Sequence, residues 1–184
     1  MNGKKIHPAL FHGILGGLVV MAAKLVLAYT GNWTIKLGGG FNMLAFLMVM
    51  LAVIFAGMAI RKIAQSVNYG RALLHGLITV SVVVFIAQIG EQIAYRTKPG
   101  LAQVTKEFQI ETMNKEMGKV KLFSGAFKEK MITELEKMEP SDIYGMVTFV
   151  GNVFTYIILD MLFVLVLAIF LRKTPDPLKQ ELME

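Results

Sequence analysis

One uninterrupted apolar run constrains the fold of the whole chain. Met43–Ile60 holds eighteen residues without a charged or polar side chain. As a helix that rises about 1.5 Å per residue, this run nearly crosses the ~30 Å hydrocarbon core of a bilayer. Helices of water-soluble domains normally keep one polar face. The run therefore predicts a membrane-spanning segment.

Further apolar stretches predict four spans in all: Pro8–Tyr29, about Gly38–Ile60, Ala72–Tyr95 and a fourth within Ile143–Leu171. The first stretch has 22 residues, whereas the apolar region of a signal peptide has only about 7–15, so we interpret it as an uncleaved span. With 55% hydrophobic residues, we expect residues 1–184 to form a single all-α polytopic membrane domain with four transmembrane helices.

The segment between the third and fourth spans, residues 96–142, has a different character. It is dense in Lys and Glu, and its apolar residues recur at helical spacing. The clearest series is Phe123, Phe127, Met131, Leu135 and Met138. We predict an extramembrane amphipathic helical insert, either a hairpin or one long kinked helix, with candidate breaks at Gly118 and Gly125. Its charges indicate a solvated face over a small apolar seam rather than a specific binding surface.

The distribution of Lys and Arg predicts the orientation of the chain. One side carries eight in short segments: Lys4, Lys5, Arg61, Lys62, Arg71, Arg172, Lys173 and Lys179. The short loop opposite has only Lys36, and the nine basic residues of the insert are balanced by eight acids. By the positive-inside rule we expect both termini in the cytoplasm and an extracytoplasmic insert. The net charge of +6 is thus a topology signal, and nucleic acid is not an expected partner because no soluble basic face is present.

Asp160 is the sharpest candidate for function. It lies near the middle of the fourth span and is followed by the wholly apolar Met161–Leu171. A charge at mid-membrane costs ~2.5–3.5 kcal/mol or more. The functional interpretation is a relay for a proton or another cation. The alternative is a neutral acid, or one that hydrogen-bonds a neighbouring helix as a structural contact.

A second group of candidates lies nearer the outer ends of the first and third spans. Lys24 is five residues from the end of its span and Glu91 four residues from the end of its own. Because their depths match, a salt bridge between the two helices is allowed; the alternative is that each side chain separately extends to the outer headgroups. Gln88 and Gln92 flank Glu91, and this polar stripe should face protein rather than lipid.

No motif of catalysis, metal binding or cofactor binding is present. The chain has no cysteine, which excludes disulfides and thiolate sites. His12 and His75 lie near the inner ends of their spans without a matching carboxylate, a poor metal site. No phosphate-binding glycine loop, Ser–His–Asp arrangement or zinc motif occurs. We therefore expect no enzyme, no cofactor and no metal. Glycines of the first span (Gly13, Gly16, Gly17) and fourth (Gly145, Gly151) indicate close helix packing.

Several segments together resemble a known family. They are the first helix PALFHGILGGLVV, the start of the third span at residues 68–77, Lys98-Pro99-Gly100, the Glu-rich helix that ends at Glu139-Pro140, and the closing AIFLRKTP. The layout is similar to that of the domain of unknown function 4199 family, small integral membrane proteins common in Bacteroidetes. This resemblance implies a four-helix protein of the bacterial inner membrane and brings no activity or catalytic residues. The glycine run Gly38–Gly40 departs from the pattern.

Two functions remain open on the sequence. The first is a non-catalytic accessory or scaffold subunit in the lipid bilayer, which binds other membrane proteins or a second copy of itself. The alternative is a small transporter or ion-translocating component in which Asp160, Glu91, Lys24 and Gln88 form a polar path. An enzyme acting on lipids is disfavoured, because the acid clusters expected at the interface are missing.

Overall fold

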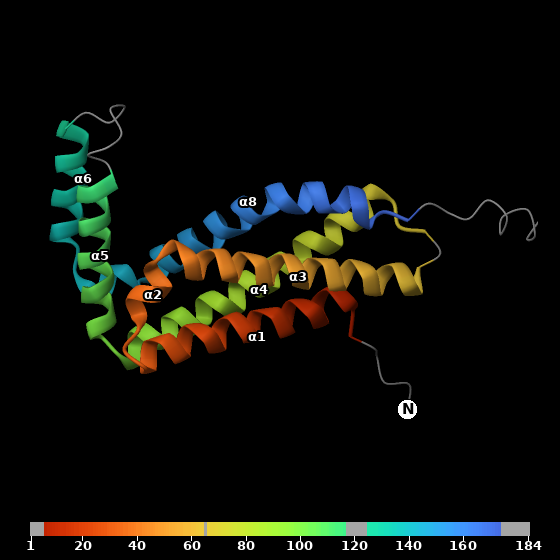
Figure 1. The fold of residues 1–184 in the computed structure, drawn as a ribbon, viewed down its shortest axis with the longest axis horizontal. Helices are drawn as coiled ribbons and strands as arrows, with labels where there is room; N and C mark the ends of the chain where they lie inside the picture. The colour runs from red at the N-terminus through yellow and green to blue at the C-terminus, as the bar shows by residue number, and fades with distance from the viewer. Residues whose placement is uncertain (1–5, 65, 117–124, 174–184) are drawn as a thin grey trace, which may run out of the picture.

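The structure, a computed structural model, describes residues 6–64, 66–116 and 125–173. All the regular elements in these ranges are helices, and Figure 1 shows their arrangement. In chain order they are α1 (Pro8–Tyr29), α2 (Trp33–Leu37), α3 (Gly39–Ile63), α4 (Tyr69–Thr97), α5 (Gly100–Glu116), α6 (Gly125–Lys137), α7 (Pro140–Ile143) and α8 (Met146–Leu171).

Four of the helices are long and apolar enough to cross a membrane: α1, α3, α4 and α8. They lie side by side as a bundle (Figure 1), with α4 in contact with each of the other three. In the apolar 18-residue stretch of α4, 44% is buried within the protein, whereas in that of the last span only 17% is buried. This confirms an all-α polytopic membrane protein with four spans. The predicted bounds of the first span agree with α1, and α3 continues three residues further than expected, to Ile63.

The connection between α1 and α3 contains a short helix that the sequence did not predict. Gly31 turns the chain with a φ of 79°, a conformation that favours glycine. Helix α2 then carries Trp33 inward, where it is only 1% exposed and donates from Nε1 to Thr105 Oγ1 at 3.0 Å. An aromatic residue at this position suggests a lipid headgroup contact, but Trp33 instead packs beneath α5.

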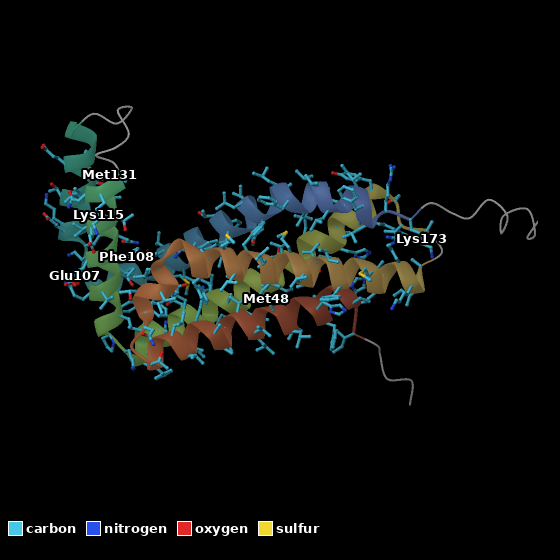
Figure 2. All side chains as sticks on the ribbon, viewed as in Figure 1. Met48, Glu107, Phe108, Lys115, Met131 and Lys173 are labelled. Atoms are coloured by element: carbon cyan, nitrogen blue, oxygen red, sulfur yellow. The ribbon has the colours of Figure 1, made fainter. Side chains whose placement is uncertain are left out.

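The insert consists of α5 and α6, which lie side by side across one end of the bundle (Figure 1). Of the two predicted forms, the hairpin fits this arrangement. Figure 2 shows the charged side chains of the insert, including Glu107 and Lys115, and the carbon-rich surface of the spans around Met48. Phe123 and Gly118 of the predicted pattern lie outside the described residues. Met131 and Leu135 are half-buried, consistent with a small apolar seam.

Glycines allow α1 and α4 to pack closely. A Cβ atom at Gly13 would lie 2.9 Å from Val82 Cβ, and one at Gly17 would lie 2.8 Å from Ile86 Cβ. The same expectation for the last span is wrong. Nothing lies within 4 Å of a Cβ at Gly151, and one at Gly145 would meet only backbone atoms of Ser141 and Asp142. Among the described residues, no helix packs against α8 at Gly151, and Gly145 is the N-cap before α8, next to α7 (Pro140–Ile143).

A packed apolar core and a backbone clasp close the bundle on the side of Asp160 away from the insert. Val53, Val80 and Val164 are each at most 1% exposed there. Val67 and Lys173 exchange two backbone hydrogen bonds of 2.9 and 2.7 Å. The Lys173 ammonium also donates to the carbonyl oxygens of Arg61 and Ala64. These bonds tie the end of α8 to the link between α3 and α4.

The packing of α4 against α8 predicts that Gly76→Ala destabilises the protein. A Cβ at Gly76 would lie 2.5 Å from Cγ1 of the buried Val164. Overpacking of a tight core typically costs ~1–3 kcal/mol, so the purified variant should unfold in detergent at a lower temperature than the parent. Gly151→Ala is the control and should not lower the melting temperature, since its site is open and alanine favours helix. Equal melting temperatures for the two variants would contradict this packing.

Candidate functional site

The structure brings Lys24 and Glu91 together, as their matching depths predicted. Lys24 comes from α1 and Glu91 from α4, and the ammonium nitrogen lies 2.7 Å from carboxylate Oε2. Both residues are 6% exposed. In a non-polar surrounding, a buried charge is tolerated only with a well-placed partner. The pair therefore joins α1 to α4 at the insert end of the bundle.

Lys36 is a second cation on the same carboxylate. Its ammonium nitrogen lies 2.5 Å from Glu91 Oε1 and 4.9 Å from the centre of the Trp33 ring. Lys36 belongs to α2, outside the membrane-spanning helices. Burial lowers the pKa of its amino group below the ordinary value, and the neighbouring Glu91 carboxylate acts in the opposite direction. We call Lys24, Lys36 and Glu91 the charge cluster; with both lysines protonated, it carries one net positive charge.

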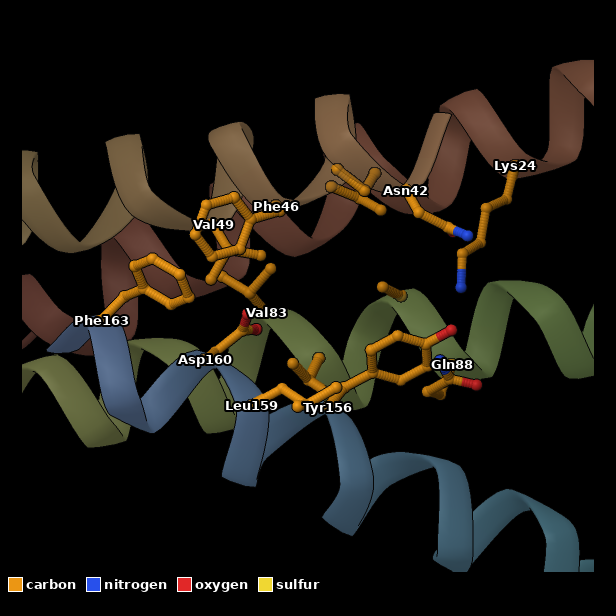
Figure 3. A pocket seen from close by; sticks show the side chains of 14 residues that line it. Lys24, Asn42, Phe46, Val49, Val83, Gln88, Tyr156, Leu159, Asp160 and Phe163 are labelled. Carbon is orange, nitrogen blue, oxygen red and sulfur yellow. The ribbon is translucent and has the colours of Figure 1, made fainter. Parts of the chain in front are cut away.

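Asp160 faces a pocket among all four spans, shown in Figure 3. The cavity has a volume of about 230 Å³, and its lining is mostly apolar. Asp160 is 7% exposed, and within the described part of the chain its side chain has no hydrogen-bond partner. Lys24 and Gln88 also line this space, which we call the Asp160 pocket. Three of the four candidates from the sequence thus line one pocket, and the fourth, Glu91, holds Lys24.

A larger and more polar cavity of about 540 Å³ lies between the insert and the spans. We call it the vestibule. Lys36 and Glu91 line it from the bundle, Thr105 and Gln109 from α5. Asn42 and Tyr156 line both the vestibule and the Asp160 pocket, so the two cavities meet at these side chains.

Lys36, Asn42 and Tyr156 are site residues that sequence reasoning missed. Lys36 was counted only as a loop charge, yet a lone lysine three residues after a tryptophan is one turn from it if the segment is helical. Tyr156 precedes Asp160 by four residues and so shares its helix face. Asn42 is the only amide side chain in α3. These patterns are visible in the sequence, but without the fold they do not identify the three side chains as part of one site.

His12 and His75 have different ring neighbours. His75 stacks on His7, with ring centres 4.8 Å apart, whereas His12 lies beside Phe11 and Phe55. No group of three metal-ligating side chains is found among the residues that the structure describes.

The chemistry available at the site follows from the two acids. Both oxygens of Glu91 are occupied by lysines, so Glu91 is a structural anion. Asp160 has no such neighbour, and a carboxyl group in this position can bind and release a proton or another small cation. Asn42, Gln88 and Tyr156 add neutral hydrogen-bonding groups on the insert side of Asp160, as Figure 3 shows.

The charge cluster predicts an unequal effect of its two simplest substitutions. Glu91→Gln leaves two lysines buried without a counter-charge, and removal of one partner of a buried ion pair typically costs ~3–5 kcal/mol. Lys24→Met leaves the neutral pair of Lys36 and Glu91 and should cost less. Thermal unfolding in detergent should therefore rank the parent first, Lys24→Met second and Glu91→Gln last.

The exposed pair of Lys115 and Glu111 provides the matched control for this ranking. Glu111→Gln removes an ion pair whose side chains are 68% and 61% exposed, and such surface pairs contribute little. Its melting temperature should equal that of the parent. If Glu91→Gln were as stable as this control, the charge cluster would not be a buried structural unit.

Comparison with known proteins gives one family match. Residues 12–173 match the family described as protein of unknown function (DUF4199). No curated protein and no solved structure matches the chain. The match extends from the first span through the last and includes the charge cluster, both cavities and Asp160. The chain therefore belongs to the DUF4199 family.

Proposed function

We propose that the protein is a small ion-translocating membrane component in which Asp160 is the ion-binding group. One observation carries this proposal: Asp160 is buried, faces a pocket and has no hydrogen-bond partner within the described ranges. A purely structural acid in a membrane would be expected to hydrogen-bond a neighbouring helix. Since Asp160 makes no such bond, the structural interpretation loses its main support.

The adjoining vestibule supports the same function, because it offers a polar approach to Asp160 from the insert side. The ion would pass from the vestibule between Asn42 and Tyr156, which are both partly exposed, into the Asp160 pocket. Beyond Asp160 the side chains of Val80 and Val164 are fully packed. The described conformation thus suits uptake from one side, and release to the other side requires this packed core to open. The proposed role requires no enzymatic activity.

We place the protein in the bacterial inner membrane with both termini in the cytoplasm and the vestibule open to the extracytoplasmic side. The excess of Lys and Arg in the short segments opposite the insert supports this placement. Arg61, Lys62 and Arg71 lie together at that end, next to the clasp of Lys173.

Single cysteines test this orientation, since the natural chain has none. In intact cells, a membrane-impermeant maleimide should label Lys130→Cys in α6 and leave Lys62→Cys in α3 unlabelled. Both natural side chains are exposed, so accessibility is matched, and both variants should react fully after the membrane is dissolved. Labelling of Lys62→Cys alone in intact cells would reverse the proposed orientation.

Asp160→Asn tests the function directly. In liposomes on a supported membrane, the parent should give a charge displacement when the outside concentration of protons, sodium or potassium is raised. Asp160→Asn should fall to the level of protein-free liposomes, because the amide cannot ionise. Glu111→Gln, the same acid-to-amide change on the exposed face of α5, should keep the parent signal. A parent that gives no displacement with any of these ions would overturn the proposal.

An accessory or scaffold subunit is the second candidate, and the surface of α8 favours it. Only 17% of the apolar 18-residue stretch of this span is buried within the protein. Side chains such as Phe154, Leu162 and Phe170 are more than half exposed. Lipid covers such a face, and a partner helix or a second copy of the chain would fit it equally well. A partner that copurifies in fixed stoichiometry, together with no ion signal, would favour this function.

A further inference from the structure

We propose that the ion bound by Asp160 is a proton and not a metal cation. This inference rests on the proposed translocation function and specifies its substrate. It is carried by the composition of the pocket and the nature of the groups that face the carboxyl.

The charges along the approach oppose the entry of any cation. An ion that enters the vestibule meets Lys36, and one that enters the Asp160 pocket meets Lys24. Glu91 carries one negative charge and contacts both ammonium groups, at 2.7 and 2.5 Å, so it offsets only one of them. With both lysines protonated, the approach has a net positive charge where the surrounding dielectric is low and charges act strongly. This charge acts on protons and metal ions alike, so the choice between them depends on what the pocket can coordinate.

The composition of the pocket disfavours a metal cation. A metal cation gives up its water shell only for several oxygen ligands at once. Around the Asp160 carboxyl, Figure 3 shows Val49, Val83 and Phe163, which offer none. The described ranges also hold no group of three or more His, Asp or Glu side chains that could bind a metal ion. A proton needs only one oxygen lone pair, which Asp160 supplies by itself.

The groups between Asp160 and the vestibule are suited to proton transfer. From α3 and α4 the pocket receives the neutral amides Asn42 and Gln88, and from α8 itself the Tyr156 hydroxyl. Lys24 of α1 is the other charged group in the lining, and Glu91 already holds it. A cavity of about 230 Å³ has room for several waters at ~30 Å³ each. A hydronium ion in the vestibule would give up its proton and leave water, and the carboxylate of Asp160 would form the new O–H bond.

Proton uptake into liposomes tests the inference. The full chain is reconstituted with a pH-sensitive dye inside, and a potassium gradient with valinomycin makes the interior negative. The parent should acidify the interior at least several-fold faster than protein-free liposomes, and replacement of sodium by choline should not change the rate. Asp160→Asn should return the rate to that of protein-free liposomes, and Glu111→Gln should keep it.

Asp160→Glu separates loss of the carboxyl from loss of the fold. It keeps an ionisable oxygen and should retain part of the acidification that Asp160→Asn abolishes. All variants are compared only when they elute as the parent does and melt at a similar temperature. Acidification by Asp160→Asn at the parent rate, or equal loss in both Asp160 variants, would overturn the assignment of the proton to this carboxyl.

A sodium or potassium indicator in parallel liposomes without ionophore distinguishes the two levels of the proposal. Asp160-dependent uptake of either metal ion with no acidification would overturn the proton inference and leave the translocation function standing. No Asp160-dependent uptake of any of the three ions would overturn the translocation function itself.

Discussion

A carboxylate surrounded by apolar helices must obtain its counter-charges from the protein, and Glu91 obtains two. Lys24 reaches it from α1 and Lys36 from α2, so one side chain of α4 fixes two other elements. Because Lys36 is held there, α2 turns inward and buries Trp33, which in turn donates to Thr105 of α5. The insert is thereby seated on the bundle through a chain of contacts that begins at a single acid.

The surroundings of Asp160 are the opposite of those of Glu91, and this difference indicates which acid is available to a ligand. Glu91 is stabilised by neighbours that are fully engaged, whereas Asp160 faces open space among Phe46, Val83 and Leu159. An apolar residue at that position would make the bundle more stable. A buried polar group that lowers stability is expected at functional sites, where the requirements of function override those of packing. The two acids thus have different roles: Glu91 orders the insert end of the bundle, and Asp160 remains available to a ligand.

The architecture could be read from the sequence because the bilayer imposes strict rules on length and polarity. Long apolar runs gave the four spans, and the equal depths of Lys24 and Glu91 gave their pairing. Lys36 and Trp33 could not be placed in this way, because their burial depends on how α2 folds back between two spans. The emptiness around Asp160 also has no sequence signal, since it arises from the angles between helices. Local rules therefore predict elements and depths, and tertiary packing decides which polar groups remain unsatisfied.

The clasp between Val67 and Lys173 bears on how α8 is able to move. It secures the C-terminal end of α8 to the α3–α4 link by backbone and ammonium bonds. The opposite half of α8 is mostly exposed, with Val147 at 88% and Phe154 at 61%. The contacts at that half, such as the ring contact of Phe149 with Phe85, are between side chains, so we expect any tilt of α8 to turn about the clasp. Such a tilt would change the width of the Asp160 pocket more than the packing at the clasp.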